Sequence, residues 1–431
     1  MEAIRPRGAH PAHLLLVLAV VLPLLWSVVE AGLAARGNRD PGWRERVLRY
    51  FTPEDVERGR AYRAAFIPGS ALRSAIVTGI LALCLFAGGG RWLADRAGAL
   101  GGGRVIIAAA LVTLALGLAL RLAQLPIDFY HGYVLEGRFG FRRLDFLPWL
   151  WRLAKSHAVA TAIEVLLVAA LFALLSRLPR SWPAVATVVG GAATLVFAIA
   201  WQAIVLPLFY HVSPLPAGPL RDGVSGLAAR AGVPVQEIRV IDQSRISAHT
   251  NAFFTGIGSR REIYLYDTLS EQHDVPEVLA VVAHEIGHWR HQHVLKGWAL
   301  AVLGMAIGFA LLSWLLAQPA FRAAAHLGGP ADPALVPVLF ALFAGVSILI
   351  APVENAVSRR FERESDRASL ALTADPATFI RMKVAMARGN RSHLLPHPFL
   401  VFWNATHPPV IERIEMAAAT PAGGGAAKST P

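Results

Sequence analysis

The chain has little charge and almost no cysteine. Only 16% of its 431 residues are Asp, Glu, Lys or Arg, whereas 55% are hydrophobic; an average soluble domain is about 25% charged. The single cysteine, Cys84, lies in an apolar stretch, so neither an intrachain disulfide nor a cluster of thiolate metal ligands can form. These shortages exclude a disulfide-stabilised secreted scaffold and indicate a protein that resides in a membrane.

Negative charge is also scarce, because 41 Lys and Arg residues outnumber 29 Asp and Glu residues and leave a net charge of +12. Such a basic balance occurs in nucleic-acid-binding proteins. In so hydrophobic a chain it fits better with arginine-rich loops that face an anionic membrane leaflet. We therefore predict a lipid bilayer as a partner and no nucleic acid.

Seven apolar runs are long enough to cross a bilayer, which takes about 20 residues in a helix. The first run could also be the apolar core of a cleaved signal peptide. Such a core has about 7–15 residues, and the first run is longer. We therefore interpret it as a retained span. The runs cover residues 14–33, 68–87, 104–123, 157–176, 184–208, 297–317 and 334–353.

The loops between these runs differ in their content of arginine and lysine. Eight arginines lie between the first two runs and five basic residues between the third and fourth, whereas the alternate loops hold three, two and one. Basic loops stay on the cytoplasmic side of a membrane. The N-terminus is therefore predicted to lie outside, and segment 210–294 and the C-terminus in the cytoplasm.

Two acidic residues, Glu30 and Glu164, fall within the apolar runs. A charge in the bilayer is costly, so each carboxylate should face protein or water rather than lipid. Glu164 either lines an aqueous cavity or makes a structural ion pair. Glu30 is close to the end of its run and fits the membrane interface.

Of all parts of the chain, segment 210–294 has the sequence most like that of a soluble protein. Its residues 218–231 have the spacing of an amphipathic helix. Short alternating runs separated by turn residues then predict a small sheet. The predicted strands are 237–241, 250–255 and 262–266, with a turn at 256–259.

The end of this segment contains an H-E-x-x-H motif, His284-Glu285-Ile286-Gly287-His288, inside an apolar run. Histidines at i and i+4 share one helix face, where both can reach a Zn²⁺ at about 2.0–2.1 Å. Glu285 lies beside them, where it can hold a zinc-bound water and take its proton. By chance the motif is expected about 0.02 times in a chain of this composition. We therefore predict one zinc ion per chain.

Two histidines leave a catalytic zinc one protein ligand short. Glu362 and Asp366 share a helix face after the last apolar run, so Glu362 can complete the site with Asp366 behind a ligand histidine. The pair can equally be a solvated, charged helix face. On spacing alone Glu364 is a rival ligand, and His291, seven positions after His284, is another competitor.

Twelve short sequence motifs, spread over most of the chain, carry a resemblance to a known family. They are residues 50–54, 58–62, 125–126, 133–136, 139–141, 206–209, 242–244, 249–254, 266–269, 284–289, 358–362 and 407–414. With these motifs the chain resembles the CAAX prenyl protease 1 family, which are integral-membrane zinc endopeptidases. The resemblance implies seven transmembrane helices around a large chamber, with the zinc site at its cytoplasmic end.

The resemblance also assigns individual residues to the metal site. His284 and His288 match the ligand histidines, and Glu285 matches the catalytic acid. Glu362 matches the third ligand, which decides against Glu364. Asp366 matches a carboxylate that supports a ligand from behind.

Further matches concern the substrate. Asn251 and Ala252 match an edge strand that pairs with an extended peptide, and His249 in the same motif is assigned to substrate binding with them. His407 matches a histidine that steadies the tetrahedral intermediate, and Arg413 an arginine behind it. The chain departs from the family at His291 and at residues 363–365, where more apolar residues are usual.

We therefore predict a mainly α, polytopic membrane protein with a zincin-like metallopeptidase core that carries a small β-sheet. Residues 1–209 would form an N-terminal transmembrane region with spans one to five. Residues 210–420 would form the metallopeptidase region with the last two spans, and residues 421–431 a disordered tail.

The predicted activity is that of a zinc metalloendopeptidase, in which Glu285 assists the attack of a zinc-bound water on a peptide bond. Substrates would be prenylated CAAX proteins or other amphipathic membrane proteins. One alternative is a heat-shock-type membrane protease, for which four spans are expected; another is a non-proteolytic protein with a structural zinc, which usually has four protein ligands. The Ala-, Arg- and Gly-rich composition suggests a bacterial inner membrane, or the endoplasmic reticulum if the source is eukaryotic. The oligomeric state stays open.

Overall fold

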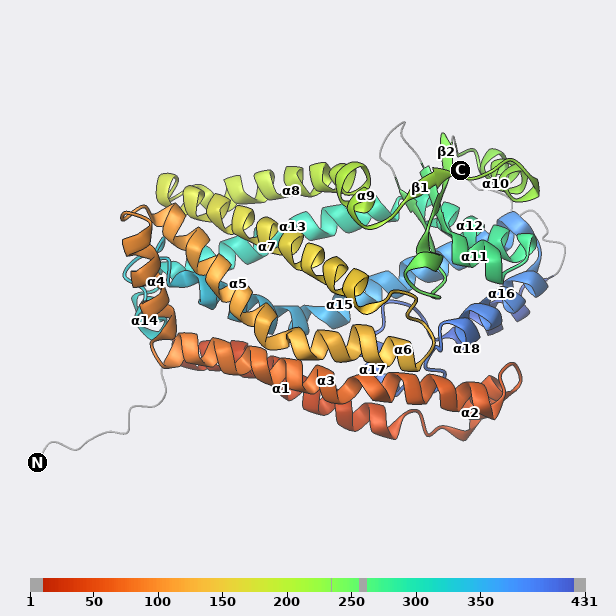
Figure 1. Cartoon of the computed structure of the whole chain (residues 1–431), viewed down its shortest axis with the longest axis horizontal. Helices are drawn as coiled ribbons and strands as arrows, with labels where there is room; N and C mark the ends of the chain where they lie inside the picture. The colour runs from red at the N-terminus through yellow and green to blue at the C-terminus, as the bar shows by residue number, and fades with distance from the viewer. Residues whose placement is uncertain (1–10, 234, 256–261, 422–431) are drawn as a thin grey trace, which may run out of the picture.

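The computed structural model describes residues 11–233, 235–255 and 262–421. Its long helices run along one axis, and helices α4 (Gly89–Leu100) and α14 (Pro319–Ala324) close one end (Figure 1). The described strands lie at the other end. The predicted turn at 256–259 and most of the predicted tail, 422–431, lie outside the described residues.

Among the described residues, six helices are long and apolar enough to cross a membrane. A seventh span results if α8 (Trp182–Ala200) is joined to η2 (Trp201–Val205) and α9 (Leu206–Phe209), with a bend of 41° between them. The seven-span prediction agrees with this arrangement. The six helices are α1 (Pro11–Arg36), α3 (Pro53–Phe86), the continuous α5–η1–α6 (Val105–Phe129, Tyr130–Leu135 and Glu136–Arg138), α7 (Phe146–Arg177), α13 (His293–Ala317) and α15 (Leu335–Thr373).

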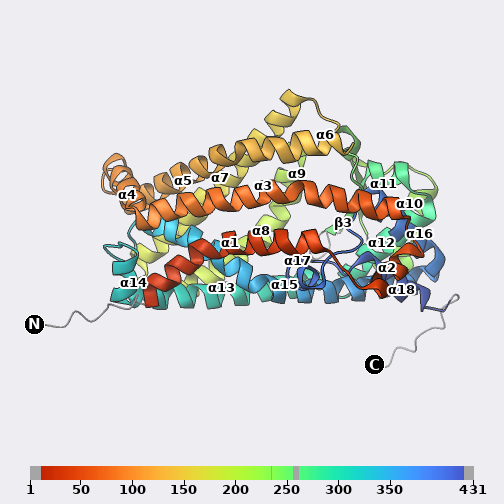
Figure 2. The same cartoon turned by 90° about the horizontal axis from the view of Figure 1, so that it is seen from below.

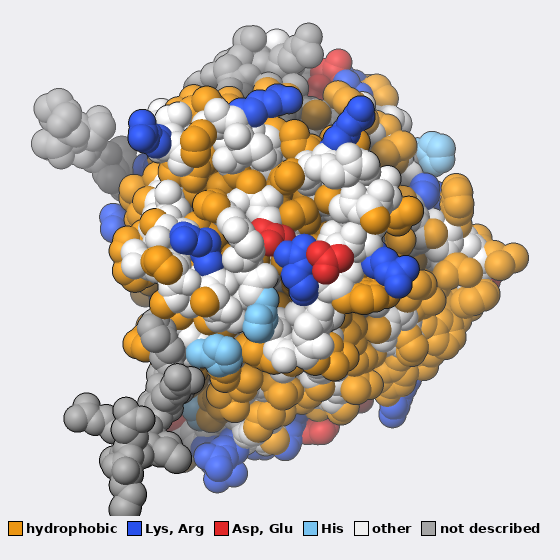
Figure 3. Space-filling model, turned by 90° about the vertical axis from the view of Figure 1, so that its left-hand side faces the viewer, with side chains coloured by type: hydrophobic (Ala, Val, Ile, Leu, Met, Phe, Trp, Pro, Cys, Tyr) orange, Lys and Arg blue, Asp and Glu red, His pale blue; other side chains and the backbone are white. Residues whose placement is uncertain are grey.

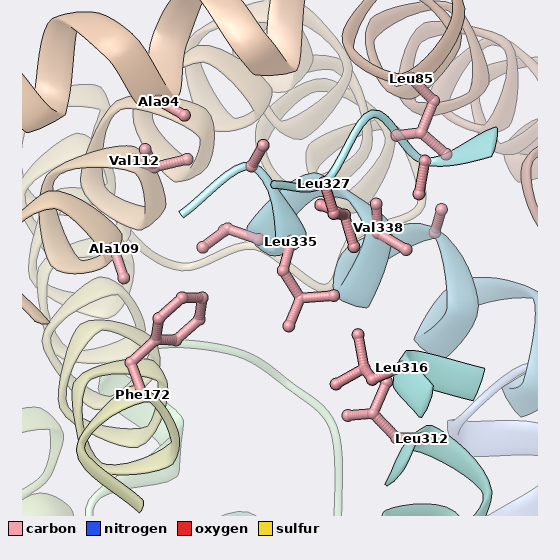
Figure 4. Close-up of a cluster of buried hydrophobic side chains, with 14 of the residues drawn as sticks. Leu85, Ala94, Ala109, Val112, Phe172, Leu312, Leu316, Leu327, Leu335 and Val338 are labelled. Atoms are coloured by element: carbon pink, nitrogen blue, oxygen red, sulfur yellow. The ribbon is translucent and has the colours of Figure 1, made fainter. Parts of the chain in front are cut away.

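The spans share a hydrophobic core beside α4 and α14 (Figure 4). Phe172 of α7 and Phe321 of α14 are at most 1% exposed there. Small residues let helices approach closely in a membrane. A Cβ on Gly345 of α15 would lie only 2.8 Å from the Cα of Ala19 in α1. The outer face of this end is largely apolar with a few scattered charges (Figure 3).

The two acidic side chains that fall within the predicted apolar runs, Glu164 and Glu30, are each paired with an arginine. Glu164 lies 2.7 Å from Arg121, so the structural ion pair that the sequence left open is present. Glu30 pairs with Arg63, which extends from the neighbouring helix α3. Such pairing is how a carboxylate is tolerated at membrane depth.

In the described part of the chain, the sheet has four strands in the order β1–β2–β4–β3. The two central strands, β2 (Glu237–Ile241) and β4 (Glu262–Tyr266), are parallel. Strand β1 (Val212–Pro214) pairs antiparallel with β2, and β3 (Ala252–Thr255) pairs antiparallel with β4. The three predicted strands are confirmed, although β3 begins at residue 252 rather than 250. The three-residue strand β1 was not predicted from the sequence.

A second hydrophobic core joins this sheet to the helices around it. Helix α10 (Pro219–Arg230) fits the predicted amphipathic helix and buries Val224 and Leu227 against this core. Figures 1 and 2 show further helices gathered at this end: α2 (Pro41–Leu48), α11 (Asp267–Gln272), α12 (Val275–Arg290), α16 (Pro376–Gly389) and α18 (Val410–Ala418). Helix α17 (Pro398–Asn404) lies nearer the middle, against α15 and α1.

Candidate metal centre

The H-E-x-x-H motif lies in the last turns of α12. The helix begins after Asp274, whose side chain accepts a hydrogen bond of 2.9 Å from the Glu277 N–H. One face of α12 is fully buried against the sheet, through residues such as Val282 and Ile286. This packing fixes the rotation of the helix. His284 and His288 consequently face α15 rather than solvent.

Helix α15 continues well past the last apolar run and lies along α12 with one buried polar face. Glu362 is 6% exposed, and Asp366 and Ser369 are fully buried. The Ser369 hydroxyl donates to the Ala280 carbonyl of α12 at 2.8 Å. The alternative interpretation of Glu362 and Asp366 as a solvated face is therefore wrong.

Gly287 allows the two helices to approach each other. A Cβ at this position would lie 2.9 Å from the Ser365 Cα and 3.0 Å from the Ala368 Cβ, both on α15. Any larger residue would push α12 away from α15. The glycine inside the motif thus controls the distance between the histidines and Glu362.

The donor atoms of His284, His288 and Glu362 form a compact triangle. The two Nε2 atoms are 3.2 Å apart, and they lie 3.3 Å and 3.2 Å from the two Glu362 oxygens. Ligands at about 2.0–2.2 Å from a tetrahedral ion are about 3.3 Å apart. Glu362 Oε2 is buried and makes no hydrogen bond of good geometry among the described residues, although Arg413 Nη2 lies 3.2 Å away. The three residues therefore fit a zinc ion.

Asp366 supports His284 from behind, because its Oδ1 lies 2.9 Å from the His284 Nδ1. Burial would lower the pKa of the His284 imidazole, but the Asp366 carboxylate raises it above the ordinary value. Arg413 of α18 and Lys383 of α16 approach the same carboxylate, at 2.6 Å and 3.5 Å. Burial, followed by the nearby Arg413, lowers the pKa of Lys383 to about 8.

The rival ligands are placed elsewhere. Glu364 lies 3.0 Å from the His293 ring, and the His291 ring stacks on the His293 ring at 5.6 Å. In the described part of the chain, only His284, His288 and Glu362 form a group of this kind. The geometry is thus consistent with Glu362, not Glu364 or His291, as the third ligand.

The residues assigned to catalysis lie around the triangle. His407 Nε2 is 3.4 Å from Glu362 Oε1, and its side chain is more than half exposed. The Thr406 hydroxyl and the His407 Nδ1 are 2.8 Å apart. Arg413 Nη2 lies 3.2 Å from Glu362 Oε2. Glu285 is half-buried and sits one position after the first ligand.

Strand β3 is an outer strand of the described sheet, and it packs against α12. Asn251 directly precedes it and accepts a hydrogen bond of 2.9 Å from the Ala252 N–H. His249 has both ring nitrogens engaged by the protein, at 3.1 Å from Glu136 and 3.2 Å from Asn390. A role of His249 in binding substrate therefore stays a prediction.

Two contacts near the site were not predicted from the sequence. Lys383 lies mid-way along α16, and no motif or spacing in its surroundings distinguishes it from a surface lysine. The contact of His293 with His288, at 3.0 Å between their Nδ1 atoms, depends on the turn between α12 and α13. Only the folded chain reveals these two contacts.

Comparison with known proteins covers almost the whole chain. Residues 214–420 match peptidase family M48, and residues 35–211 match the family described as CAAX prenyl protease N-terminal, five membrane helices. CAAX prenyl protease 1 of Saccharomyces cerevisiae is 28% identical over 68% of each chain. The uncharacterized metalloprotease YhfN of Bacillus subtilis is 28% identical over 70% of this chain and 71% of its own.

The fold has a solved counterpart. The crystal structure of S. mikatae Ste24p superposes with a TM-score of 0.83 at 21% identity, over 95% of this chain and 100% of that chain. Together with the family matches, the fold and site define a multi-pass membrane metalloprotease. The chain belongs to the CAAX prenyl protease 1 family, within peptidase family M48.

Proposed function

We propose that the chain is a zinc endopeptidase in which His284, His288 and Glu362 hold one Zn²⁺. The observation that carries this proposal is the spacing of 3.2–3.3 Å between their donor atoms where α12 meets α15. When bound, zinc supplies Lewis-acid chemistry, which polarises a peptide carbonyl and makes water easier to deprotonate.

Glu285 acts as the general base and then as the general acid. It takes a proton from the attacking water and returns it to the nitrogen of the departing amine. Its position suits both tasks, because it follows His284 on the same helix and is half open to its surroundings. No other acidic residue within H-E-x-x-H competes for this role.

His407 is proposed to stabilise the developing oxyanion, with Arg413 behind it. His407 is more than half exposed, lies 3.4 Å from Glu362 and can donate a hydrogen bond to a substrate oxygen beside it. A donor of this kind is worth about 3–4 kcal/mol in acyl-transfer sites. Arg413 contacts Glu362 and Asp366 and holds both carboxylates in place.

The substrate is proposed to bind as an extended peptide along the outer edge of β3, beginning at Asn251 and Ala252. Pairing through backbone groups tolerates many sequences. Relatives from yeast and human carry the name CAAX prenyl protease, whereas the Bacillus subtilis relative is named only as a metalloprotease. We therefore propose amphipathic membrane proteins as substrates, with prenylated CAAX proteins as one class among them.

The site is proposed to lie on the cytoplasmic side. Helices α2 and α6, which belong to the arginine-rich connections, lie at the same end as α12 and α18 (Figures 1 and 2). Basic loops favour the cytoplasmic face. The heat-shock-type alternative would have about four spans, whereas the described part of this chain holds six or seven candidates. A structural zinc is disfavoured because only three donors meet among the described residues.

The test is cleavage of a prenylated CAAX peptide and its unprenylated twin by the purified chain, with and without a zinc chelator. We expect cleavage that stops with chelator and returns with added Zn²⁺. The Glu285→Gln variant should keep its zinc and lose activity. Near-normal activity of that variant would refute the role of Glu285, and equal cleavage of both peptides would refute a requirement for the prenyl group.

A further inference from the structure

The second ligand histidine has a support of its own. His288 Nδ1 lies 3.0 Å from the Nδ1 of His293, and the other ring nitrogen of His293 lies 3.0 Å from a Glu364 oxygen. The second Glu364 oxygen accepts from Arg360 Nε at 3.0 Å. Four side chains from α12, α13 and α15 thus form a continuous line that ends at a ligand.

The backbone between α12 and α13 brings this line together. Gln292 adopts a left-handed conformation with φ 55°, which is unfavourable for a residue with a side chain by about 1 kcal/mol. The turn folds the start of α13 back, so that His293 faces the end of α12. There His293 is only 5% exposed and stacks on Phe361 of α15 at 4.1 Å.

The positions of the protons follow from the proposed zinc site. If His288 binds zinc through Nε2, its neutral ring must carry a proton on Nδ1. This N–H donates to His293 Nδ1, which must therefore be unprotonated. The proton of His293 is then on Nε2, where it donates to the Glu364 carboxylate. Each hydrogen bond in the line has one donor and one acceptor.

We propose that His293 and Glu364 are positioning residues that fix the tautomer and orientation of His288. The inference rests on the proposed zinc function and extends it to two residues without a role so far. His284 is supported directly by Asp366, which is fully buried, whereas His288 is supported through a second imidazole. Partners of ligand histidines commonly change metal affinity by about 10–100-fold when they are replaced.

The test measures zinc affinity of the purified full-length chain by competition with a chromophoric chelator. His293→Leu removes the acceptor and leaves the His288 N–H unpaired, so affinity should fall about 10–100-fold. His293→Asn places an amide oxygen where Nδ1 was and should restore affinity to within about threefold of the parent protein. Glu364→Ala should lie between these two. His291→Leu, which changes a neighbouring histidine that stacks on His293, should bind zinc normally.

Two further readouts separate positioning from simple packing. The visible absorption of the Co²⁺-substituted protein should change in His293→Leu and return to the parent spectrum in His293→Asn. Melting of the metal-free variants tests whether each remains folded. An unchanged affinity and Co²⁺ spectrum in His293→Leu would overturn the proposal while leaving the zinc site intact. Failure of the unmodified chain to bind zinc would instead overturn the proposed function itself.

Discussion

Arg413 holds both oxygens of the Asp366 carboxylate, with Nε and Nη2 each at 2.6 Å. Both side chains are buried, and Asp366 also faces His284 and Lys383. One carboxylate on α15 therefore connects α12, α16 and α18. The paired cations keep Asp366 ionised, and an ionised carboxylate accepts the outer N–H of the ligand histidine.

The first prediction concerns this pair. Arg413→Met would leave a buried carboxylate without its main partner, a change that costs about 3–5 kcal/mol. Arg413→Lys keeps the charge but loses the two-point contact, so its cost should be smaller. Thermal melting and zinc affinity of the purified protein measure both effects. Arg381→Met, at a mostly exposed position on α16, is the control. Equal melting of the two methionine variants would contradict the role of Arg413.

The second prediction concerns Gly287. Its substitution by alanine would place a Cβ 2.9 Å from the Ser365 Cα, so α12 and α15 must separate. Overpacking of this kind costs about 1–3 kcal/mol. Because Glu362 moves with α15, zinc affinity should fall as well.

Gly297→Ala is the matched control for this change. A Cβ at Gly297 in α13 meets nothing within 4 Å, and alanine favours a helix. This variant should bind zinc normally and melt no earlier than the parent protein. Normal zinc affinity in Gly287→Ala would show that the close approach of the two helices does not control the site.

The third prediction is a pH dependence from Lys383. Burial, followed by the nearby Arg413, lowers its pKa from 10.5 to about 8 in the folded protein. Below pH 8 both folded and unfolded forms are protonated, and the full cost of burying the charge is present. Between pH 8 and 10.5 the unfolded form binds more protons, so this contribution to stability rises with pH, by at most about 3 kcal/mol.

Lys383→Met removes this titration. The melting temperature of the parent protein should therefore rise relative to that of Lys383→Met as the pH increases from 8 to 10. Measuring both proteins at each pH cancels the titration of all other groups. If the difference between the two melting temperatures stays constant from pH 8 to 10, the pKa of Lys383 is not lowered in the folded protein.

The fourth prediction concerns the substrate strand. Asn251 accepts from the Ala252 N–H and shapes the start of β3, so Asn251→Ala should loosen the edge on which a peptide is proposed to pair. We expect kcat/KM to fall about tenfold, equivalent to about 1.4 kcal/mol, with zinc affinity unchanged. Kinetics with one peptide and a zinc titration on the same sample measure both. A loss of zinc in this variant would place Asn251 in the construction of the metal site instead.

The membrane spans and the metal helix were predictable because their signals are local. Long apolar runs identify spans by themselves, and H-E-x-x-H carries its own helical spacing. The choice between Glu362 and Glu364 could not be made from spacing, because it depends on how α15 is rotated against α12. The resemblance to a known family supplied that choice, and the compact donor triangle is consistent with it.

Other features depend on contacts between distant segments. Only 11% of the Lys383 side chain is exposed, because α16 packs against α15 and α18. The parallel pairing of β2 with β4 skips over β3, which no local pattern could indicate. Helix α15 runs about 20 residues past the apolar run at 334–353 as one continuous helix, and hydropathy alone does not mark its end.

The most direct test of the account is the zinc content and X-ray absorption spectrum of the purified chain, compared with Glu362→Ala. The central claim is that two histidines of α12 and one carboxylate of α15 hold a single zinc. We predict one zinc per chain with two imidazoles and oxygen ligands, and loss of the metal in Glu362→Ala. Three imidazoles in the spectrum, or full zinc content in Glu362→Ala, would contradict it.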